Sequence, residues 1–229
     1  MEERSSKIEI TVVSKDGEKR KMSKVIREQV VVVRIDGEIN RLYCIPSDLE
    51  AMILGNLASR GIHASFSNIR KIANNEFSVD LSLMKQSPKN APRCQSKKEL
   101  ASKEVFHSVE MLNENSILHE KTGCTHVVGI CGEQEIFVED ISRHCAIDKA
   151  IGLAIGKGID LSNSLLVTSC RQTASTIKKA IFCQIPVVVS IAAATDLAVK
   201  EADKYGITLI GFANSRRFNI YCNGWRIKI

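Results

Sequence analysis

The sequence predicts an α/β protein built as a three-layer sandwich, preceded by a smaller, strand-rich α+β subdomain. Three observations support this. After Gly123, short β-branched runs alternate with helical patterns to the end of the chain. Runs such as 165–167 and 187–189 contain no polar residue, as expected of strands that helices cover on both faces. The first third of the chain, in contrast, consists mainly of strand patterns.

Residues 1–83 form the predicted N-terminal subdomain. The dipeptide Asp36-Gly37 lies between two β-branched runs and favours a tight hairpin turn. One helix is expected to begin with Ser47 as its N-cap, with Glu50 three residues later completing a capping box. The strands of this subdomain are expected at 30–35, 39–45, 66–72 and 77–83.

A loop separates the two parts of the chain. Residues 84–98 have no hydrophobic periodicity and contain two prolines, four lysines and an arginine. This composition predicts an exposed, mobile, basic loop. The α/β domain then occupies residues 99–229.

The α/β domain has regularly spaced elements. Helices are expected at 99–113, 115–121, 143–156, 172–182 and 195–205. Strands are expected at 125–131, 134–139, 164–169, 186–191, 207–212 and 218–222. Ligands of such sheets gather beyond the carboxyl ends of the strands. This rule directs attention to residues 140–144, 169–172 and 191–195.

Composition excludes several classes of protein. The chain has 229 residues, 44% hydrophobic and 25% charged, which is close to the globular average and excludes intrinsic disorder, collagen and coiled coil. Charged and polar residues interrupt its most apolar region, so we expect no membrane insertion. The first residues show no targeting signal, and the eight scattered cysteines are expected to be reduced. Together these features predict a cytoplasmic protein.

The positive charge is concentrated in two segments. The formal net charge is +6. Residues 85–104 carry six basic groups against two acids, and residues 212–229 carry four basic groups and no acid. If the fold joins these segments, they form an anion-binding site. Only 5% of the residues are aromatic, and none interleaves with the basic groups of the first segment, so nucleic-acid binding is disfavoured.

The densest polar cluster, residues 139–149, joins a strand end to a helix start. His144 and Asp148 are four residues apart and therefore share one helical face. Five ionisable groups at a buried helix start are costly unless they are paired or used. Two interpretations remain: a functional site, or solvent-facing ion pairs on a helix that Ser142 caps.

A second polar turn, Ser169-Cys170-Arg171, also precedes a helix. Free amides at a helix start and a guanidinium group suit a phosphate. The alternative is that Arg171 forms an ion pair with Asp140 or Asp148.

Cys94 differs from the other cysteines because it lies in the cationic loop. Arg93, Lys97 and Lys98 should favour its thiolate, which makes nucleophilic or sulfur-carrying chemistry feasible. The alternative is an incidental exposed cysteine. No metal site is predicted, because no common zinc spacing occurs among Cys124, His126, Cys131, His144 and Cys145.

Several motifs together resemble one family. The longest is Glu139-Asp140-x-x-Arg143-His144-x-Ala146-x-Asp148-Lys149. Further matching stretches are Thr122-Gly123-x-x-His126, Ser169-x-Arg171, Ala194-Thr195-x-Leu197-Ala198-Val199, Gly211-Phe212 and Arg217-Phe218-Asn219-x-Tyr221. On these residues, and over nearly the whole chain, the sequence resembles the formate dehydrogenase accessory sulfurtransferase (FdhD) family.

The resemblance implies a cytoplasmic homodimer that accepts sulfane sulfur from a cysteine desulfurase. It implies delivery of that sulfur to the molybdenum or tungsten bis-pterin guanine dinucleotide cofactor of the formate dehydrogenase catalytic subunit. That cofactor is a transient, anionic ligand, and no tightly bound metal of the protein's own is implied. The implied fold resembles that of cytidine deaminases, yet their zinc signature is absent, so deamination is not expected.

The resemblance also implies the site residues. Cys94 is the catalytic, persulfide-forming residue. The residues expected to bind the cofactor are His126, Asp140, Arg143, His144, Asp148, Lys149, Ser169, Arg171, Phe212, Ala213, Asn214, Ser215, Arg216, Arg217, Phe218 and Asn219. Family members that transfer sulfur carry Cys-x-x-Cys in the loop, whereas this loop contains Cys94 alone. The first hypothesis is therefore a persulfide carrier, and the alternative is a non-catalytic chaperone that binds the cofactor or the apo-dehydrogenase.

Overall fold

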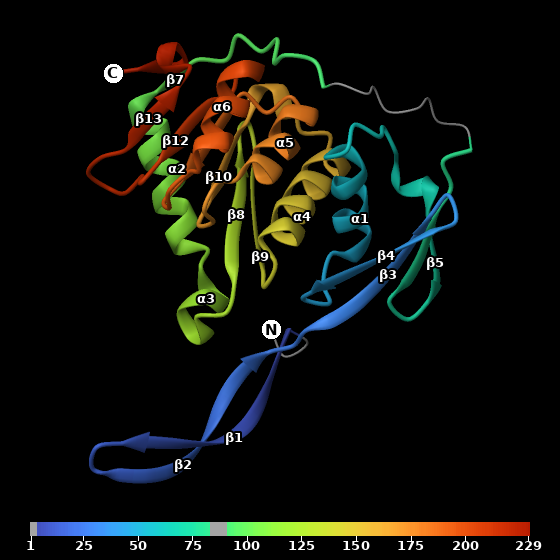
Figure 1. Cartoon of the computed structure of the whole chain (residues 1–229), viewed down its shortest axis with the longest axis vertical. Coiled ribbons are helices and arrows are strands. Elements are labelled where there is room, and N and C mark those ends of the chain that lie inside the picture. Colours follow the sequence, from blue (N-terminus) through green and yellow to red (C-terminus); the bar gives the residue numbers. More distant parts are fainter. Residues whose placement is uncertain (1–3, 83–90) are drawn as a thin grey trace.

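The structure is a computed structural model that describes residues 4–82 and 91–229, and in these ranges it has four sheets flanked by α-helices (Figure 1). The architecture is mixed α/β. Residues 84–90 of the predicted loop, and the last residue of the strand predicted at 77–83, lie outside the described residues.

The largest sheet has six strands in the order β13-β12-β11-β10-β8-β9. The pairs β10–β11 and β11–β12 are parallel, and the other three pairs are antiparallel. The strands are β8 (His126–Cys131), β9 (Glu135–Asp140), β10 (Leu165–Thr168), β11 (Val187–Ser190), β12 (Thr208–Gly211) and β13 (Asn219–Cys222). Each lies within one residue of its predicted position.

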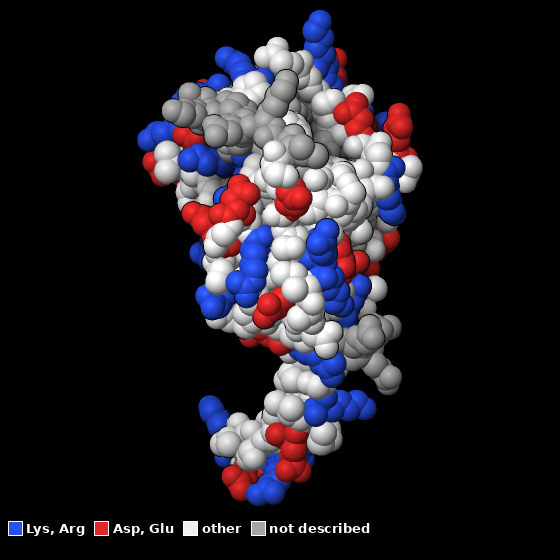
Figure 2. Space-filling view, turned by 90° about the vertical axis from the view of Figure 1, so that its right-hand side faces the viewer, with Lys and Arg blue, Asp and Glu red and all other residues white. Residues whose placement is uncertain are grey.

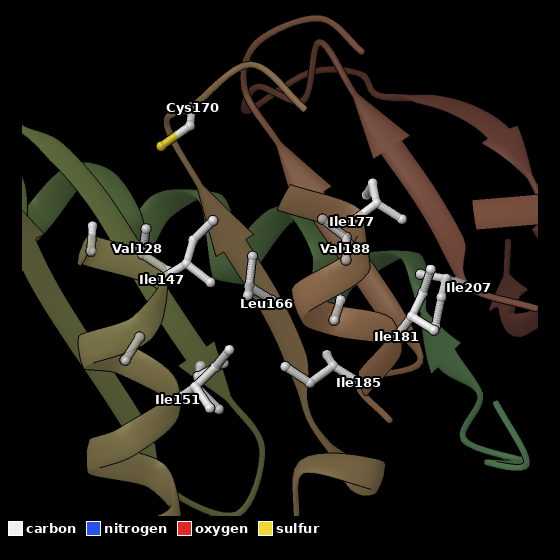
Figure 3. Close-up of a cluster of buried hydrophobic side chains, with 14 of the residues drawn as sticks. Val128, Ile147, Ile151, Leu166, Cys170, Ile177, Ile181, Ile185, Val188 and Ile207 are labelled. Carbon is white, nitrogen blue, oxygen red and sulfur yellow. The ribbon is translucent and has the colours of Figure 1, made fainter. Parts of the chain in front are cut away.

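Helices cover both faces of this sheet. One face packs against α4 (Arg143–Gly156), α5 (Ala174–Phe182) and α6 (Asp196–Tyr205), and the other packs against α2 (Ser102–Glu114). Leu166 of β10 faces α4 and α5, as Figure 3 shows, whereas its neighbours Leu165 and Val167 belong to the core beneath α2. This alternation explains the unbroken apolar runs, because every side chain of the strand is buried.

The N-terminal sheet has the order β4-β3-β6-β5. Its strands are β3 (Gln29–Ile35), β4 (Glu38–Cys44), β5 (Ile69–Ala73) and β6 (Glu76–Val79). The predicted hairpin between β3 and β4 is confirmed, and both Asp36 and Gly37 have positive φ, as a tight turn of this kind requires. Met52, Ile53 and Leu57 of α1 (Leu49–Ala58) complete the core of this part.

Two glycines let α1 pack directly on α4. A Cβ atom on Gly55 would lie 1.9 Å from the backbone oxygen of Asp148, and one on Gly152 would lie 1.8 Å from that of Ala51. No other residue type permits so close a backbone approach. This contact holds the N-terminal part against the middle of α4.

The predicted capping of α1 is wrong. The helix begins one residue later than a Ser47 cap requires, and its N-cap is Asp48, which has φ 54° and makes no side-chain cap hydrogen bond. A left-handed residue at this position turns the side chain away from the free amides of the first turn. Sequence spacing alone does not reveal that backbone conformation.

A long hairpin projects from the body and was not predicted. Strands β1 (Ser5–Ser14) and β2 (Gly17–Ile26) pair only with each other and extend below the rest of the molecule (Figure 1). Lysine, arginine and acidic side chains mix along this hairpin and on the adjoining face of the body (Figure 2).

The remaining elements are α3 (Ile117–Thr122) and the short parallel pair β7 (Leu100–Ala101) and β14 (Ile227–Lys228). In the described ranges, no helix is long and apolar enough to cross a membrane.

Candidate functional site

The predicted site turns meet at one edge of the six-stranded sheet. His126 at the start of β8 pairs with Asp140 at the end of β9. Ser169, which follows β10, donates its N–H to the Val127 carbonyl at 3.0 Å, and its Oγ accepts the Val127 N–H at 3.0 Å. The strand ends therefore bring together the segments that follow β9 and β10 in sequence.

Backbone hydrogen bonds extend this edge to the turns after β11 and β12. Gln172 N–H donates to the Ala193 carbonyl at 2.9 Å, and Ser190 Oγ donates to the Cys170 carbonyl at 2.7 Å. Ala213 N–H donates in turn to the Ser190 carbonyl at 3.0 Å. The turns at 140–144, 169–172, 191–195 and 212–219 therefore line one edge, which we call the strand-end edge.

Arg143 is central to the electrostatics of the strand-end edge. Burial and then the nearby Arg143 lower the pKa of the half-buried His126, with Arg171 adding to the effect. Burial, Lys179 and Arg143 also lower the pKa of His144. Both imidazoles are therefore neutral near pH 7 and available as hydrogen-bond donors beside fixed cations.

The guanidinium of Arg143 has an unused donor. Its Nε is buried and finds no hydrogen-bond partner among the described residues. A buried donor of this kind costs free energy unless a ligand accepts from it. The donor set at this edge fits an anionic ligand such as a phosphate group.

The turn after β12 presents two further arginines. Asn214 Oδ1 accepts the N–H groups of Arg216 at 2.9 Å and Arg217 at 3.1 Å, which holds both residues in an exposed turn. Within this predicted segment, Phe212, Asn214, Ser215 and Asn219 are exposed, whereas Ala213 is buried and Phe218 packs against Phe106.

Three of the residues predicted to bind the cofactor, Asp140, Asp148 and Lys149, form buried ion pairs. Asp140 accepts from Lys149 Nζ at 2.7 Å and from the Ile45 N–H at 3.2 Å, and both charged side chains are fully buried. Burial raises the pKa of Asp140, and Lys149 opposes that shift. Asp148 pairs with Lys179.

Asp148 also accepts from Asn56 Nδ2 of α1 at 2.9 Å and from Oγ of Ser59, the C-cap of that helix, at 3.0 Å. These carboxylates therefore secure α4 to the N-terminal part. Both carboxylates also act on the site histidines, because Asp140 partly offsets the lowering of the His126 pKa and Asp148 partly offsets that of His144. The proposed pairing of Arg171 with either carboxylate is not found in the described structure, where Arg171 is exposed.

A pocket of about 560 Å³ opens beside the start of α4. Its lining includes His144, Ser142 and Cys145 from α4 and its cap, Tyr43 from β4, and the exposed Cys124. Sequence reasoning gave Cys124 no role of its own. Its place between α3 and β8, next to residues of β4, depends on contacts that are distant in sequence.

Cys94 lies elsewhere, and the prediction that it is exposed is wrong. Its side chain is 8% exposed, and its N–H donates to the carbonyl of Tyr205, the last residue of α6, at 2.8 Å. Residues 91–99 cross the upper end of the sheet in Figure 1, where β11 and β12 begin, whereas β8 begins at the lower end near α3. We call this the strand-start edge. A six-residue strand such as β8 separates the two edges by roughly 17 Å.

The structure shows why sequence misplaced Cys94. The loop composition predicts exposure, but the groups that bury Cys94 come from α6, from the end of α5 and from the C-terminal segment. No local sequence pattern predicts these contacts. In the described part of the chain, no group of three or more His, Cys, Asp or Glu side chains is placed to hold a metal ion.

Comparisons with known proteins agree with the resemblance seen in the sequence. Residues 80–228 match the model of the FdhD/NarQ family. The chain is 28% identical to "Sulfur carrier protein FdhD" of Wolinella succinogenes, covering 95% of this chain and 88% of the relative. It is 26% identical to the protein of the same name from Methanothermobacter thermautotrophicus, covering 96% and 98%.

A solved structure shows the same fold. A crystal structure of a protein described as a candidate formate dehydrogenase accessory protein, from Desulfotalea psychrophila, superposes with a TM-score of 0.84 at 23% identity. The match covers 98% of this chain and all of that chain, so it includes the N-terminal part that the family model omits. By its match to the family model over most of its length, the chain belongs to the FdhD/NarQ family.

Proposed function

We propose that this protein is a formate dehydrogenase accessory protein that carries sulfane sulfur. The sulfur would come from a cysteine desulfurase and pass to the molybdenum or tungsten bis-pterin guanine dinucleotide cofactor of formate dehydrogenase. Family membership and the near full-length match to relatives named as sulfur carriers support this proposal.

The observation that carries the cofactor-binding part is the unpartnered Nε of Arg143 beside two neutral histidines. Arg143 and Arg171 would bind one phosphate-bearing arm, and Arg216 and Arg217 would bind the other. His126 and His144 would donate hydrogen bonds to the same anion. When bound, the cofactor supplies the metal centre that receives the sulfur.

The loading step assigned to Cys94 balances without an oxidant. The Cys94 thiolate attacks the terminal sulfur of the donor persulfide, so a bond forms between Sγ and that sulfur. The S–S bond of the donor breaks, and the donor cysteine leaves as a thiolate. Delivery then requires residues 91–98 to leave the strand-start edge. Cys94 lies six positions before Leu100 of β7, which allows a reach of about 20 Å when this stretch is extended.

Persulfide labelling tests the sulfur-carrying role. The protein is incubated with a cysteine desulfurase and cysteine, and each cysteine peptide is then analysed with a persulfide-selective reagent. We expect the label on Cys94 and its loss in Cys94→Ala, whereas Cys124→Ala, which removes an exposed thiol, retains it. Equal labelling of Cys94→Ala and the parent chain would exclude Cys94 as the carrier.

A second candidate function is a chaperone that binds the cofactor or the apo-dehydrogenase without transferring sulfur. The burial of Cys94, and the absence of Cys-x-x-Cys from the sequence, favour it. Persulfide labelling separates the two functions, because a chaperone of this kind gains no label on Cys94, whereas calorimetry with GDP tests the binding site itself. This candidate predicts GDP binding that survives Cys94→Ala and weakens in Arg217→Ala by about 1–3 kcal/mol, the contribution of a charged hydrogen bond.

The matched control for that titration is Arg20→Ala, which removes an exposed arginine on the projecting hairpin. Unchanged GDP affinity in Arg217→Ala would exclude the turn after β12 from the binding site.

We further propose that the protein acts in the cytoplasm as a homodimer, with residues 1–83, 84–98 and 99–229 as its functional parts. All eight cysteines are unpaired, which suits a reducing compartment. The helices on both faces of the six-stranded sheet suit the proposed likeness of residues 99–229 to the cytidine deaminase fold.

A further inference from the structure

Arg226 is a fully buried arginine at the strand-start edge. It lies in the short 3-10 helix η4 (Gly224–Arg226), is 1% exposed, and its guanidinium stacks 4.1 Å from the centre of the Trp225 ring. A buried guanidinium is costly unless an anion compensates its charge.

The neighbours of Arg226 supply dipoles but no carboxylate. Nη1 donates to the carbonyls of Ser96 at 2.6 Å and Lys98 at 3.3 Å, and Nη2 donates to that of Gly206 at 3.1 Å. Nε has no partner in residues 4–82 and 91–229. Over the same ranges, Arg226 forms no ion pair with an aspartate or a glutamate.

Among the residues that the structure describes, the ionisable group recorded beside this guanidinium is the thiol of Cys94, whose Sγ lies 4.0 Å from Nη2. Burial lowers the pKa of Arg226, and Cys94 acts in the opposite direction, as a counter-ion does. We propose that Arg226 holds the Cys94 sulfur as an anion in a closed, buried position at the strand-start edge. Arg226 is then a positioning residue, and its use in sulfur carriage rests on the proposed function.

The other groups around the sulfur agree with this assignment. Cys94 Sγ also lies 3.9 Å from the Gln184 carbonyl. That contact is with a neutral dipole, whereas Arg226 carries a full positive charge at nearly the same distance. Arg93 and Lys97 on the same segment add positive charge, and Tyr205 of α6 contributes only its backbone carbonyl to Cys94.

The segment around Cys94 is held on the strand-start edge by several hydrogen bonds. Gln184 Nε2 donates to the Pro92 carbonyl at 3.3 Å, and Ser96 Oγ donates to the Ser162 carbonyl at 2.6 Å. Gly206, with φ 74°, ends α6 where a Cβ atom would lie 3.1 Å from Arg93 Nε. These contacts hold the Cys94 sulfur away from solvent until the segment undocks.

Ultraviolet thiolate absorbance tests the ion pair directly. Burial raises the pKa of Cys44, Cys131 and Cys183 to about 12, and that of Cys145 and Cys170 to about 11, and it also raises that of Cys222. These six thiols contribute no thiolate near neutral pH. In a Cys124→Ser chain, which lacks the exposed thiol, we expect a thiolate signal near neutral pH that Cys94→Ser removes.

Arg226 variants then identify the source of that anion. Arg226→Gln should move the pH at which the Cys94 thiolate appears upward by about one unit or more, a tenfold change, whereas Arg226→Lys should retain most of the signal. Circular dichroism confirms folding. If either arginine variant does not fold, the comparison of Cys124→Ser with and without Cys94→Ser still decides whether the anion exists. Absence of a Cys94-dependent thiolate signal, or an unchanged midpoint in folded Arg226→Gln, overturns the proposal.

The inference and the proposed function can fail separately. A Cys94 thiolate that never gains sulfur after treatment with desulfurase and cysteine leaves the Arg226 assignment intact and removes the carrier role. Sulfur gained at Cys94 without any thiolate signal supports the carrier role and removes the Arg226 assignment.

Discussion

The two edges of the six-stranded sheet hold their cations differently. At the strand-end edge, Arg143 keeps an unused Nε, and Arg171, Arg216 and Arg217 are exposed. At the strand-start edge, Arg226 is buried and lies 4.0 Å from the Cys94 sulfur. The strand-end edge therefore offers its cations to an anionic ligand from outside. At the strand-start edge, in contrast, the proposed counter-ion of Arg226 is the protein's own Cys94 sulfur.

In the proposed function, the cofactor therefore binds at the strand-end edge, whereas the Cys94 sulfur is held at the strand-start edge. The two sites do not share residues, and roughly the length of a strand separates them. Variants at one edge should therefore leave the other edge unchanged. The following predictions use that independence, beginning with the largest expected effect.

Lys149→Met should cause the largest loss of stability. It leaves Asp140 buried and unpaired beneath the strand-end edge, which should lower the free energy of unfolding by about 3–5 kcal/mol. Urea denaturation at neutral pH measures this loss. Lys200→Met, which breaks an exposed pair with Asp196, is the matched control and should leave the denaturation midpoint unchanged. A midpoint shift in Lys149→Met no larger than that of the control would contradict the structural role of the pair.

Arg143→Gln should weaken GDP binding by about 1–3 kcal/mol, or roughly 5- to 150-fold, because it removes a charged donor from the strand-end edge. Arg226→Gln should leave GDP affinity unchanged, because it alters only the strand-start edge. Calorimetry of both variants checks the comparison. A similar loss of affinity in both would show that the two edges are coupled.

Acidification should produce the smallest effect. The native pKa values of His126 and His144 lie below their ordinary value of 6.5, mainly because of burial. Between those native values and 6.5 the unfolded chain binds more protons, so stability should fall as the pH is lowered through this range. His126→Gln combined with His144→Gln should reduce the fall.

Thermal unfolding at several pH values measures the acid effect, and His63→Gln, which replaces an exposed histidine, is the control. A bound anion at the strand-end edge stabilises the protonated imidazoles, so GDP should also reduce the fall. An equal pH dependence in the double variant and the parent chain would argue against buried, neutral histidines at this edge.

Local patterns predicted the elements of the α/β domain well. The apolar runs of β10 and β11 and the helical pattern of α4 specify their positions, because burial on both faces leaves no alternative periodicity. The convergence of the 140–144, 169–172 and 191–195 turns also followed from sequence, since strand ends meet at a sheet edge. The β1–β2 hairpin was missed because most of its side chains are exposed and give little hydrophobic signal.

The residue types of the site, its positive charge and the family motif were determined by the sequence alone. Only the tertiary structure decided which of these groups face a ligand. Asp140 and Asp148 belong to the motif, yet they are used inside the protein, because Ile45 after β4 and Ser59 at the end of α1 supply partners from about a hundred residues away. The composition around Cys94 predicts an exposed basic loop, whereas the fold buries Cys94 in contact with Arg226. Burial depends on residues that are distant in sequence, and a local pattern does not contain them.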